Sequence, residues 1–225
     1  RETYLKDILE RHNVAFPESL ALIADELCSA VGSLTNASKI ADTLMTVRQT
    51  KIDSETVGTY LGYLTEAYLF DRSDRYDVKG RKYFSYPSKY YCVDTGLRNA
   101  RLNFRQLEET HLMENVIFNE LSGRGHSVDV GVVETIDQLG EKRMRRTYEI
   151  DFVVNAETAG EKYYIQSALN LDTPEKTAQE IRPFLKIRND FTRRIVITKS
   201  TMPAWTDEYG ILHLGIYDFL LRETF

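Results

Sequence analysis

No stretch of the 225-residue sequence approaches the roughly 20 apolar residues that a membrane helix needs, and none resembles a signal peptide. Cysteine is scarce: Cys28 and Cys92 stand far apart without metal-ligand spacing, which argues against a disulfide framework or a zinc site. Positive charge is not in excess, because 29 basic and 34 acidic residues give a net charge of −5. This balance excludes a uniformly basic nucleic-acid coat and leaves a local basic face open. We expect a soluble, cytoplasmic protein without a membrane partner.

The usual signatures of nucleotide hydrolysis and nucleophilic catalysis are also missing. The sequence has no Gly-x-x-x-x-Gly-Lys-Ser/Thr loop, and its four histidines are scattered without ligand spacing. We therefore expect this chain by itself neither to bind nor to hydrolyse ATP. It begins at Arg1, inside an amphipathic helical pattern, so we expect it to be a fragment of a longer protein.

The first half reads as helices followed by a hairpin. Apolar residues recur at helical spacing, with Asn36 or Ser38 and then Asp53 or Ser54 as N-cap candidates for two helices joined by a short connection. Tyrosine-rich strands follow, separated by a turn at Lys79-Gly80. Helix, turn, helix and hairpin predict a winged-helix domain over residues 1–98.

Basic residues interleave with tyrosines in this hairpin, a composition suited to contact with nucleic-acid phosphates. Together with the helix at residues 53–68, the hairpin predicts weak DNA binding. A winged helix is also often a protein-interaction adaptor, and that alternative stays open. The predicted nucleic-acid contacts are Arg72, Arg75, Lys79, Arg81, Lys82 and Lys89.

The second half, residues 99–225, begins with an amphipathic helix and continues with several strands, a helix, a strand and a last helix. This order predicts a mixed sheet flanked by helices, an α/β (α+β) class. Its carboxylates of interest are Glu114 on the helix and Glu149 with Asp151 on a strand, where residues two apart share a face. Two carboxylates suit Mg²⁺. The plainer alternative pairs them with the arginines at 143, 145 and 146.

Several segments together resemble the C-terminal region of a group of bacterial and archaeal predicted ATPases of the AAA type. They read KGRKYFSYPSKYYCVDTGLRNA, HLMENVIFNELSGRGHSVDVG, YEIDFVV, YYIQSALNL, EIRPFLKI and GILHLGIYDFLL, and they cover nearly the whole chain. The resemblance implies a winged helix followed by a domain similar to the PD-(D/E)xK restriction-endonuclease-like fold. It places an ATP-binding domain upstream in the same protein.

Within that resemblance, Glu114 matches the nuclease helix glutamate and Asp151 the strand aspartate. The third element departs from the pattern, because Gln166-Ser167-Ala168 stands where Glu-x-Lys is expected. A neutral amide thus replaces a metal-ligating carboxylate, and a methyl group replaces the lysine that stabilises charge on the phosphate. Any Mg²⁺ at Glu114 and Asp151 is expected to bind weakly, and this fragment requires no other cofactor.

Three functions follow from these observations. In the first, the chain is the C-terminal part of an ATPase and binds nucleic acid or a protein partner through a winged helix and a non-catalytic nuclease-like domain. In the second, Glu114, Glu149, Asp151 and Gln166 form a metal-dependent DNA nuclease site. In the third, both domains are protein-interaction modules.

Overall fold

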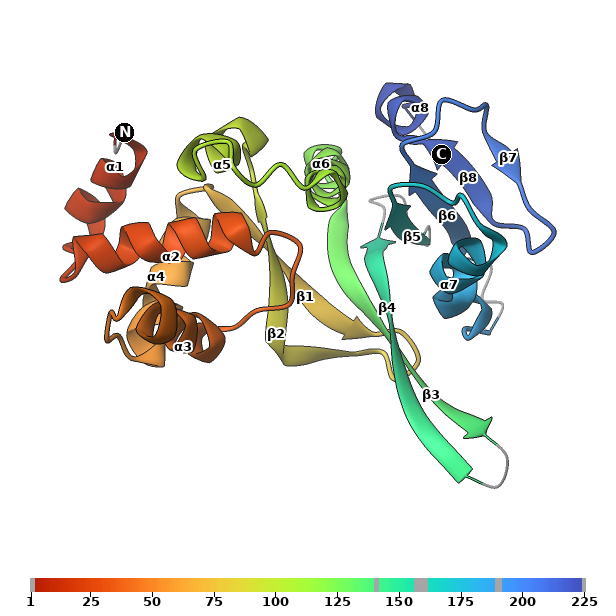
Figure 1. Cartoon of the computed structure of the whole chain (residues 1–225), viewed down its shortest axis with the longest axis horizontal. Coiled ribbons are helices and arrows are strands. Elements are labelled where there is room, and N and C mark those ends of the chain that lie inside the picture. The colour runs from red at the N-terminus through yellow and green to blue at the C-terminus, as the bar shows by residue number, and fades with distance from the viewer. Residues whose placement is uncertain (1–2, 140–141, 156–161, 189–191, 224–225) are drawn as a thin grey trace. The chain divides into compact units, whose positions relative to one another are not determined.

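A computed structural model describes residues 3–139, 142–155, 162–188 and 192–223 (Figure 1). These residues form eight helices and one eight-stranded mixed sheet of order β2-β1-β3-β4-β5-β6-β8-β7, which confirms the expected mixed α/β class. The chain divides into two compact units, residues 1–73 with 86–108 and residues 74–85 with 109–225. The hairpin tip at 74–85 therefore belongs to the second unit. Within the described ranges, no helix is long and apolar enough to span a bilayer.

Unit 1 is mainly helical, and its helix starts follow the capping residues of the sequence. The side chain of Asn36 accepts a hydrogen bond from the backbone N–H of Lys39, and Asp53 accepts one from Thr56, both at 2.8 Å. These contacts satisfy backbone N–H groups that have no partner within the first turn of a helix. Of the predicted N-cap candidates, Asn36 and Asp53 are therefore the ones observed. The helices are α1 (Thr3–His12), α2 (Pro17–Ser29), α3 (Ala37–Arg48), α4 (Ser54–Glu66) and α5 (Thr95–Arg101).

The two cysteines lie together in the interior of unit 1. Cys28 of α2 and Cys92, at the end of β2, are both fully buried, form no disulfide, and share a hydrogen bond between their thiols. That hydrogen bond and burial raise the pKa of the Cys28 thiol. The neighbouring guanidinium of Arg98 is also fully buried, and its Nε donates to the Cys28 carbonyl at 3.0 Å.

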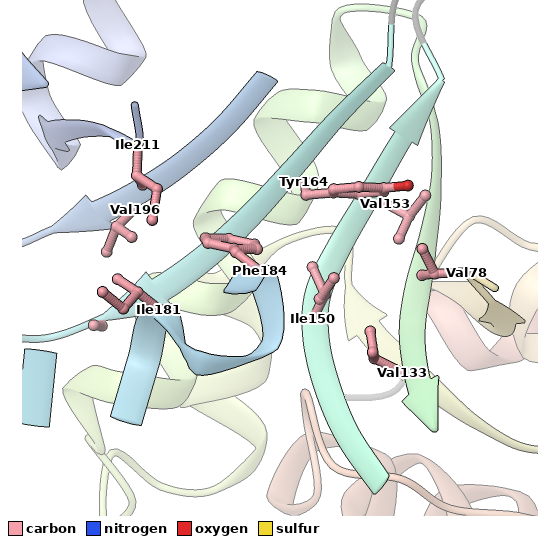
Figure 2. Close-up of a cluster of buried hydrophobic side chains, with 10 residues drawn as sticks. Val78, Val133, Ile150, Val153, Tyr164, Ile181, Phe184, Val196 and Ile211 are labelled. Carbon is pink, nitrogen blue, oxygen red and sulfur yellow. The ribbon is translucent and has the colours of Figure 1, made fainter. Parts of the chain in front are cut away.

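Unit 2 is a sheet covered by helices on both faces. Phe152 packs toward Phe118 of α6, with ring centroids 6.4 Å apart, whereas Val153 belongs to a core cluster with Phe184 of α7 (Figure 2). Neighbouring strand residues point to opposite faces, so α6 and α7 cover opposite sides. The elements are α6 (Glu109–Gly123), β3 (Ser127–Leu139), β4 (Lys142–Asn155), β5 (Lys162–Ala168), α7 (Pro174–Leu185), β6 (Arg193–Thr198), β7 (Trp205–Thr206), β8 (Leu212–Gly215) and α8 (Ile216–Leu221).

Strands β1 (Phe70–Asp77) and β2 (Lys82–Cys92) run through both units. The end of β1 pairs in parallel with β3, where Asp77 lies beside Val132. Strands β3 and β4 form a long antiparallel hairpin whose far half extends beyond the rest of unit 2 (Figure 1). The β1–β2 turn and this hairpin therefore lie side by side in unit 2, because Val78 donates its N–H to the Val132 carbonyl at 3.0 Å.

Candidate nucleic-acid interface and nuclease-like centre

The β1–β2 turn is shaped by one carboxylate. Asp77 is 7% exposed, and its Oδ1 accepts the backbone N–H groups of Lys79 and Gly80 at 3.1 and 2.8 Å. A Cβ at Gly80 would lie 2.2 Å from Asp77 Oδ2, so a side chain there would displace the carboxylate that holds the turn. Arg81 follows at φ 53° and donates its N–H to the Asp77 carbonyl at 2.7 Å. The turn thus holds three basic residues, at positions 79, 81 and 82, on a backbone fixed by hydrogen bonds.

The six predicted basic contacts have different environments. Lys79, Arg81 and Lys82 are exposed at the turn, and Arg72 is exposed in unit 1. Arg75 is half-buried, and its guanidinium carbon lies 5.1 Å from the ring centroid of Phe84.

Lys89 does not fit the predicted interface. Lys89 is only 3% exposed, and it lies in a segment of β2, residues 88–92, in which every residue is buried. A side chain in that position cannot reach a nucleic-acid phosphate, so we remove Lys89 from the set of contacts.

The structure adds arginines that the sequence analysis treated only as ion-pair partners. Arg143 and Arg145 lie on one face of the β3–β4 hairpin and are exposed. Arg145 pairs with the carboxylate of Glu134 on β3, and Lys79 donates to the Glu134 backbone carbonyl at 2.9 Å. Glu134 thus links the hairpin to the turn. We name Lys79, Arg81, Lys82, Arg143 and Arg145 the basic group; the run Arg143-Met144-Arg145-Arg146 was its signal in the sequence.

A hydrogen bond on the same strands joins an exposed tyrosine, Tyr83, to a buried carboxylate, Asp129. The Tyr83 hydroxyl donates to Asp129 Oδ2 at 2.8 Å. Burial and this acidic partner raise the pKa of Tyr83 to about 12. Burial also raises the pKa of Asp129, and the hydrogen bond from Tyr83 opposes that rise. The pair fixes β2 to β3 in unit 2 close to the turn.

Strand β4 carries an irregularity at the predicted aspartate. Asp129 of β3 pairs with Val153, but Gly131 pairs with Ile150, so β4 has one extra residue there, as in a β-bulge. Ile150 and Val153 both enter the core cluster, and the alternation that predicts a shared face for Glu149 and Asp151 does not continue through this segment. Asp151 is 8% exposed and its Oδ2 accepts the Ser167 backbone N–H at 2.8 Å.

Position 166 faces α7. The Gln166 side chain donates to Glu180 of α7, and its Oε1 has no hydrogen-bond partner among the described residues. Burial raises the pKa of Glu180, and the hydrogen bond from Gln166 opposes the rise. Ala168, two residues on, is 3% exposed and lies in the core cluster with Ile181. Neither position presents a charged group.

The remaining nuclease-like residues lie on two elements. Glu114 is 8% exposed on α6, which packs on the sheet face opposite α7, and Glu149 is half-buried on β4. Over the residues that the structure covers, no three His, Cys, Asp or Glu side chains gather as a metal-binding group. Because Mg²⁺ prefers charged oxygen ligands and Gln166 supplies a neutral amide, the residues present do not fit a tightly held Mg²⁺.

Comparison with known proteins gives matches over both units. Residues 1–108 match the model of a domain of unknown function (DUF8612). The chain is 33% identical to an uncharacterized protein of Haemophilus influenzae over 97% of this chain and 50% of that protein. It is 30% identical to the uncharacterized protein MJ1544 of Methanocaldococcus jannaschii over 83% of this chain and 38% of the relative. The chain thus spans half or less of the length of these curated relatives.

Among solved structures, the crystal structure of protein VC1899 from Vibrio cholerae covers 90% of this chain and 54% of its own, at 13% identity and a TM-score of 0.28. That score is too low for the likeness to bear on fold or function.

Proposed function

We propose that the chain binds nucleic acid through the basic group, mainly by phosphate contacts. The observation that carries the proposal is the convergence of the β1–β2 turn and the β3–β4 hairpin on Glu134, where Lys79 and Arg145 meet. Arg81 and Lys82 follow in the same turn and Arg143 lies on the same hairpin face, all exposed in a chain of net charge −5. Arginine and lysine contacts to phosphates supply affinity without sequence specificity. The protein-interaction alternative predicts no dependence on these five residues in a nucleic-acid assay.

The nuclease-like centre binds and does not cleave in this proposal. Phosphodiester cleavage needs a held metal and a positive charge near the phosphate. Gln166 is engaged with Glu180, and Ala168 is packed among apolar side chains, which supports a non-catalytic site. Loss of one electrostatic contact to a transition state typically costs about a hundredfold or more in rate.

The partner of this chain within its own protein is a nucleotide-binding domain in our proposal. The support is twofold: the sequence resembles the region that follows such a domain in predicted ATPases, and the curated relatives are at least twice as long as the part matched here. ATP is then a ligand of the other domain, and nucleic-acid binding by this chain would require no ATP.

Titration of labelled duplex DNA at two salt concentrations tests the proposal. With five phosphate contacts, the slope of log K against log salt is about −4.5, and affinity falls several hundredfold, roughly, between 50 and 200 mM salt. The change Arg81→Ala with Lys82→Ala is expected to bring the slope to about −2.7.

A matched control removes two exposed basic residues from helix α1, by Lys6→Ala with Arg11→Ala. This control removes two positive charges, as the Arg81, Lys82 variant does, and its slope of log K against log salt is expected to equal that of the parent. Equal affinities for the parent and the Arg81, Lys82 variant at both salt concentrations would remove the turn from the interface.

A further inference from the structure

A ligand-sized cavity lies in unit 2, away from the basic group. Its volume is about 620 Å³, within the range of about 300–1,000 Å³ that small-molecule sites occupy. It opens where β5, β6 and β8 end, and its lining includes residues 169–172, 198–200 and 213–215. These three strands are parallel neighbours, so their carboxyl ends meet at one edge of the sheet. In open sheets this edge is the usual place for a ligand.

One wall of the cavity is an aromatic platform. Trp205 of β7 pairs with His213 of β8, and their rings stack with centroids 4.2 Å apart and an interplanar angle of 8°. His213 covers one face of the indole, yet Trp205 is 50% exposed and lines the cavity. The pairing of β7 with β8 holds the two rings in this position. It thus offers a positioned aromatic surface to a planar ligand.

The histidine under the platform is fixed and incompletely bonded. His213 is 4% exposed, and its Nε2 lies 3.0 Å from Asp207 Oδ2. Asp207 Oδ1 accepts the backbone N–H groups of Tyr209 and Ile211 at 2.9 Å, which holds the carboxylate in place. A carboxylate partner assigns the proton to Nε2, which leaves Nδ1 as an acceptor. Among the described residues, Nδ1 has no hydrogen-bond partner.

Polar groups surround the rest of the cavity. Asn170, Asp172 and Ser200 supply amide, carboxylate and hydroxyl groups, and Lys199 lies at the cavity with its Nζ 2.6 Å from Glu109 Oε1. These groups give the cavity a polar rim beside the aromatic platform. A planar ring with donors and acceptors on its edge meets both the aromatic platform and the polar lining.

We propose that this cavity binds a nucleobase, stacked on Trp205, with its edge hydrogen-bonded to the polar lining. Every nucleobase has a π-face that stacks on an aromatic side chain, and removing such a side chain weakens binding by roughly tenfold. The base can belong to a free nucleotide or to an unpaired residue of a single-stranded nucleic acid. The site uses no residue of the basic group and does not rest on the function proposed above.

Trp205 is the only tryptophan in the sequence, so its fluorescence reports on this site alone. The 225-residue chain is titrated with adenosine and cytidine monophosphates, with a single-stranded oligonucleotide, and with an abasic oligonucleotide of the same length. Saturable quenching by the monophosphates identifies a nucleotide site. Quenching by the base-containing oligonucleotide, but not by the monophosphates or the abasic strand, identifies an unpaired base in a strand. No saturable change with any of these, or equal quenching by the abasic strand, overturns the proposal.

Equilibrium dialysis with the labelled ligand that quenches then tests the platform itself. We expect Trp205→Ala to weaken binding about tenfold or more and Trp205→Phe to retain part of the affinity. The control Tyr68→Ala removes an aromatic side chain that is 78% exposed in unit 1 and is expected to leave the affinity unchanged. Parent-like binding by Trp205→Ala overturns the assignment.

Discussion

Ala168 occupies the position at which an active nuclease of the resembled class would carry lysine, and Ala168→Lys probes whether the site could accept one. The methyl group is 3% exposed and belongs to a cluster with Ile181 and Phe184 of α7 and Val196 of β6. A lysine there adds a long aliphatic chain and an ammonium group to a closed apolar space. The structure therefore predicts loss of stability and no gain of activity.

The expected loss of stability in Ala168→Lys has two contributions. Overpacking a well-filled core costs about 1–3 kcal/mol, and the incompletely solvated ammonium adds roughly 1–3 kcal/mol unless it reaches a carboxylate. At about 2–4 °C per kcal/mol for a chain of this size, the melting temperature is expected to fall by roughly 10 °C. Adding Gln166→Glu places a second carboxylate beside Glu180 and the new lysine, so the double variant is expected to recover part of this loss.

Thermal unfolding followed by circular dichroism measures the effect. The control Ala100→Lys adds the same side chain at an exposed position of α5, where the expected change is within about 0.5 kcal/mol. A melting temperature of Ala168→Lys within 2 °C of the parent, set here as roughly the resolution of the assay, would show that the core is not closed around residue 168.

Two further substitutions test local geometry in unit 2. Gly131→Ala would place a Cβ 2.8 Å from both Ile150 Cβ and Val153 Cγ2. We expect this crowding to destabilise the chain by about 1–3 kcal/mol in urea unfolding. An unchanged urea midpoint would contradict the packing of β3 on β4. Tyr83→Phe removes the hydrogen bond that lowers the pKa of Asp129, so that pKa is expected to rise in an NMR titration. The pKa of Tyr83 is about 12 when folded and 10.0 in its reference state, so its stabilising contribution is complete below pH 10 and is lost as the pH rises toward 12. The parent should therefore lose more stability than Tyr83→Phe over that interval, and equal losses would contradict the assignment.

Local features of the fold were predictable from the sequence because local chemistry determines them. Asn36 and Asp53 are short polar side chains just before an apolar helical pattern, and they are the observed N-caps. Lys79-Gly80 lies in the observed turn between β1 and β2. The class of the sheet also followed from the order of helical and strand patterns.

Features that depend on distant neighbours were not predictable. Lys89 looked like a surface cation, but both faces of β2 are covered at residues 88–92, and alternation alone cannot show this. Cys28 and Cys92 are 64 positions apart and still share a hydrogen bond, because α2 packs near the end of β2. The pairing of Gln166 with Glu180 likewise requires the packing of α7 on β5.

The nucleotide-binding partner domain, the DNA contact and the absence of cleavage remain predictions. They rest on the resemblance, on the exposure of the basic group and on the amide and methyl groups at Gln166 and Ala168.

One experiment tests the central claim, that the chain binds nucleic acid without cutting it. End-labelled single-stranded, double-stranded and branched DNA is incubated with the chain in Mg²⁺ or Mn²⁺, and each sample is divided between a native gel for binding and a denaturing gel for strand length. We expect salt-sensitive retardation that weakens in Arg81→Ala with Lys82→Ala, together with full-length strands at every time point. Strand cleavage that stops on addition of a chelator and disappears in Asp151→Ala would show an active metal-dependent nuclease and contradict the account.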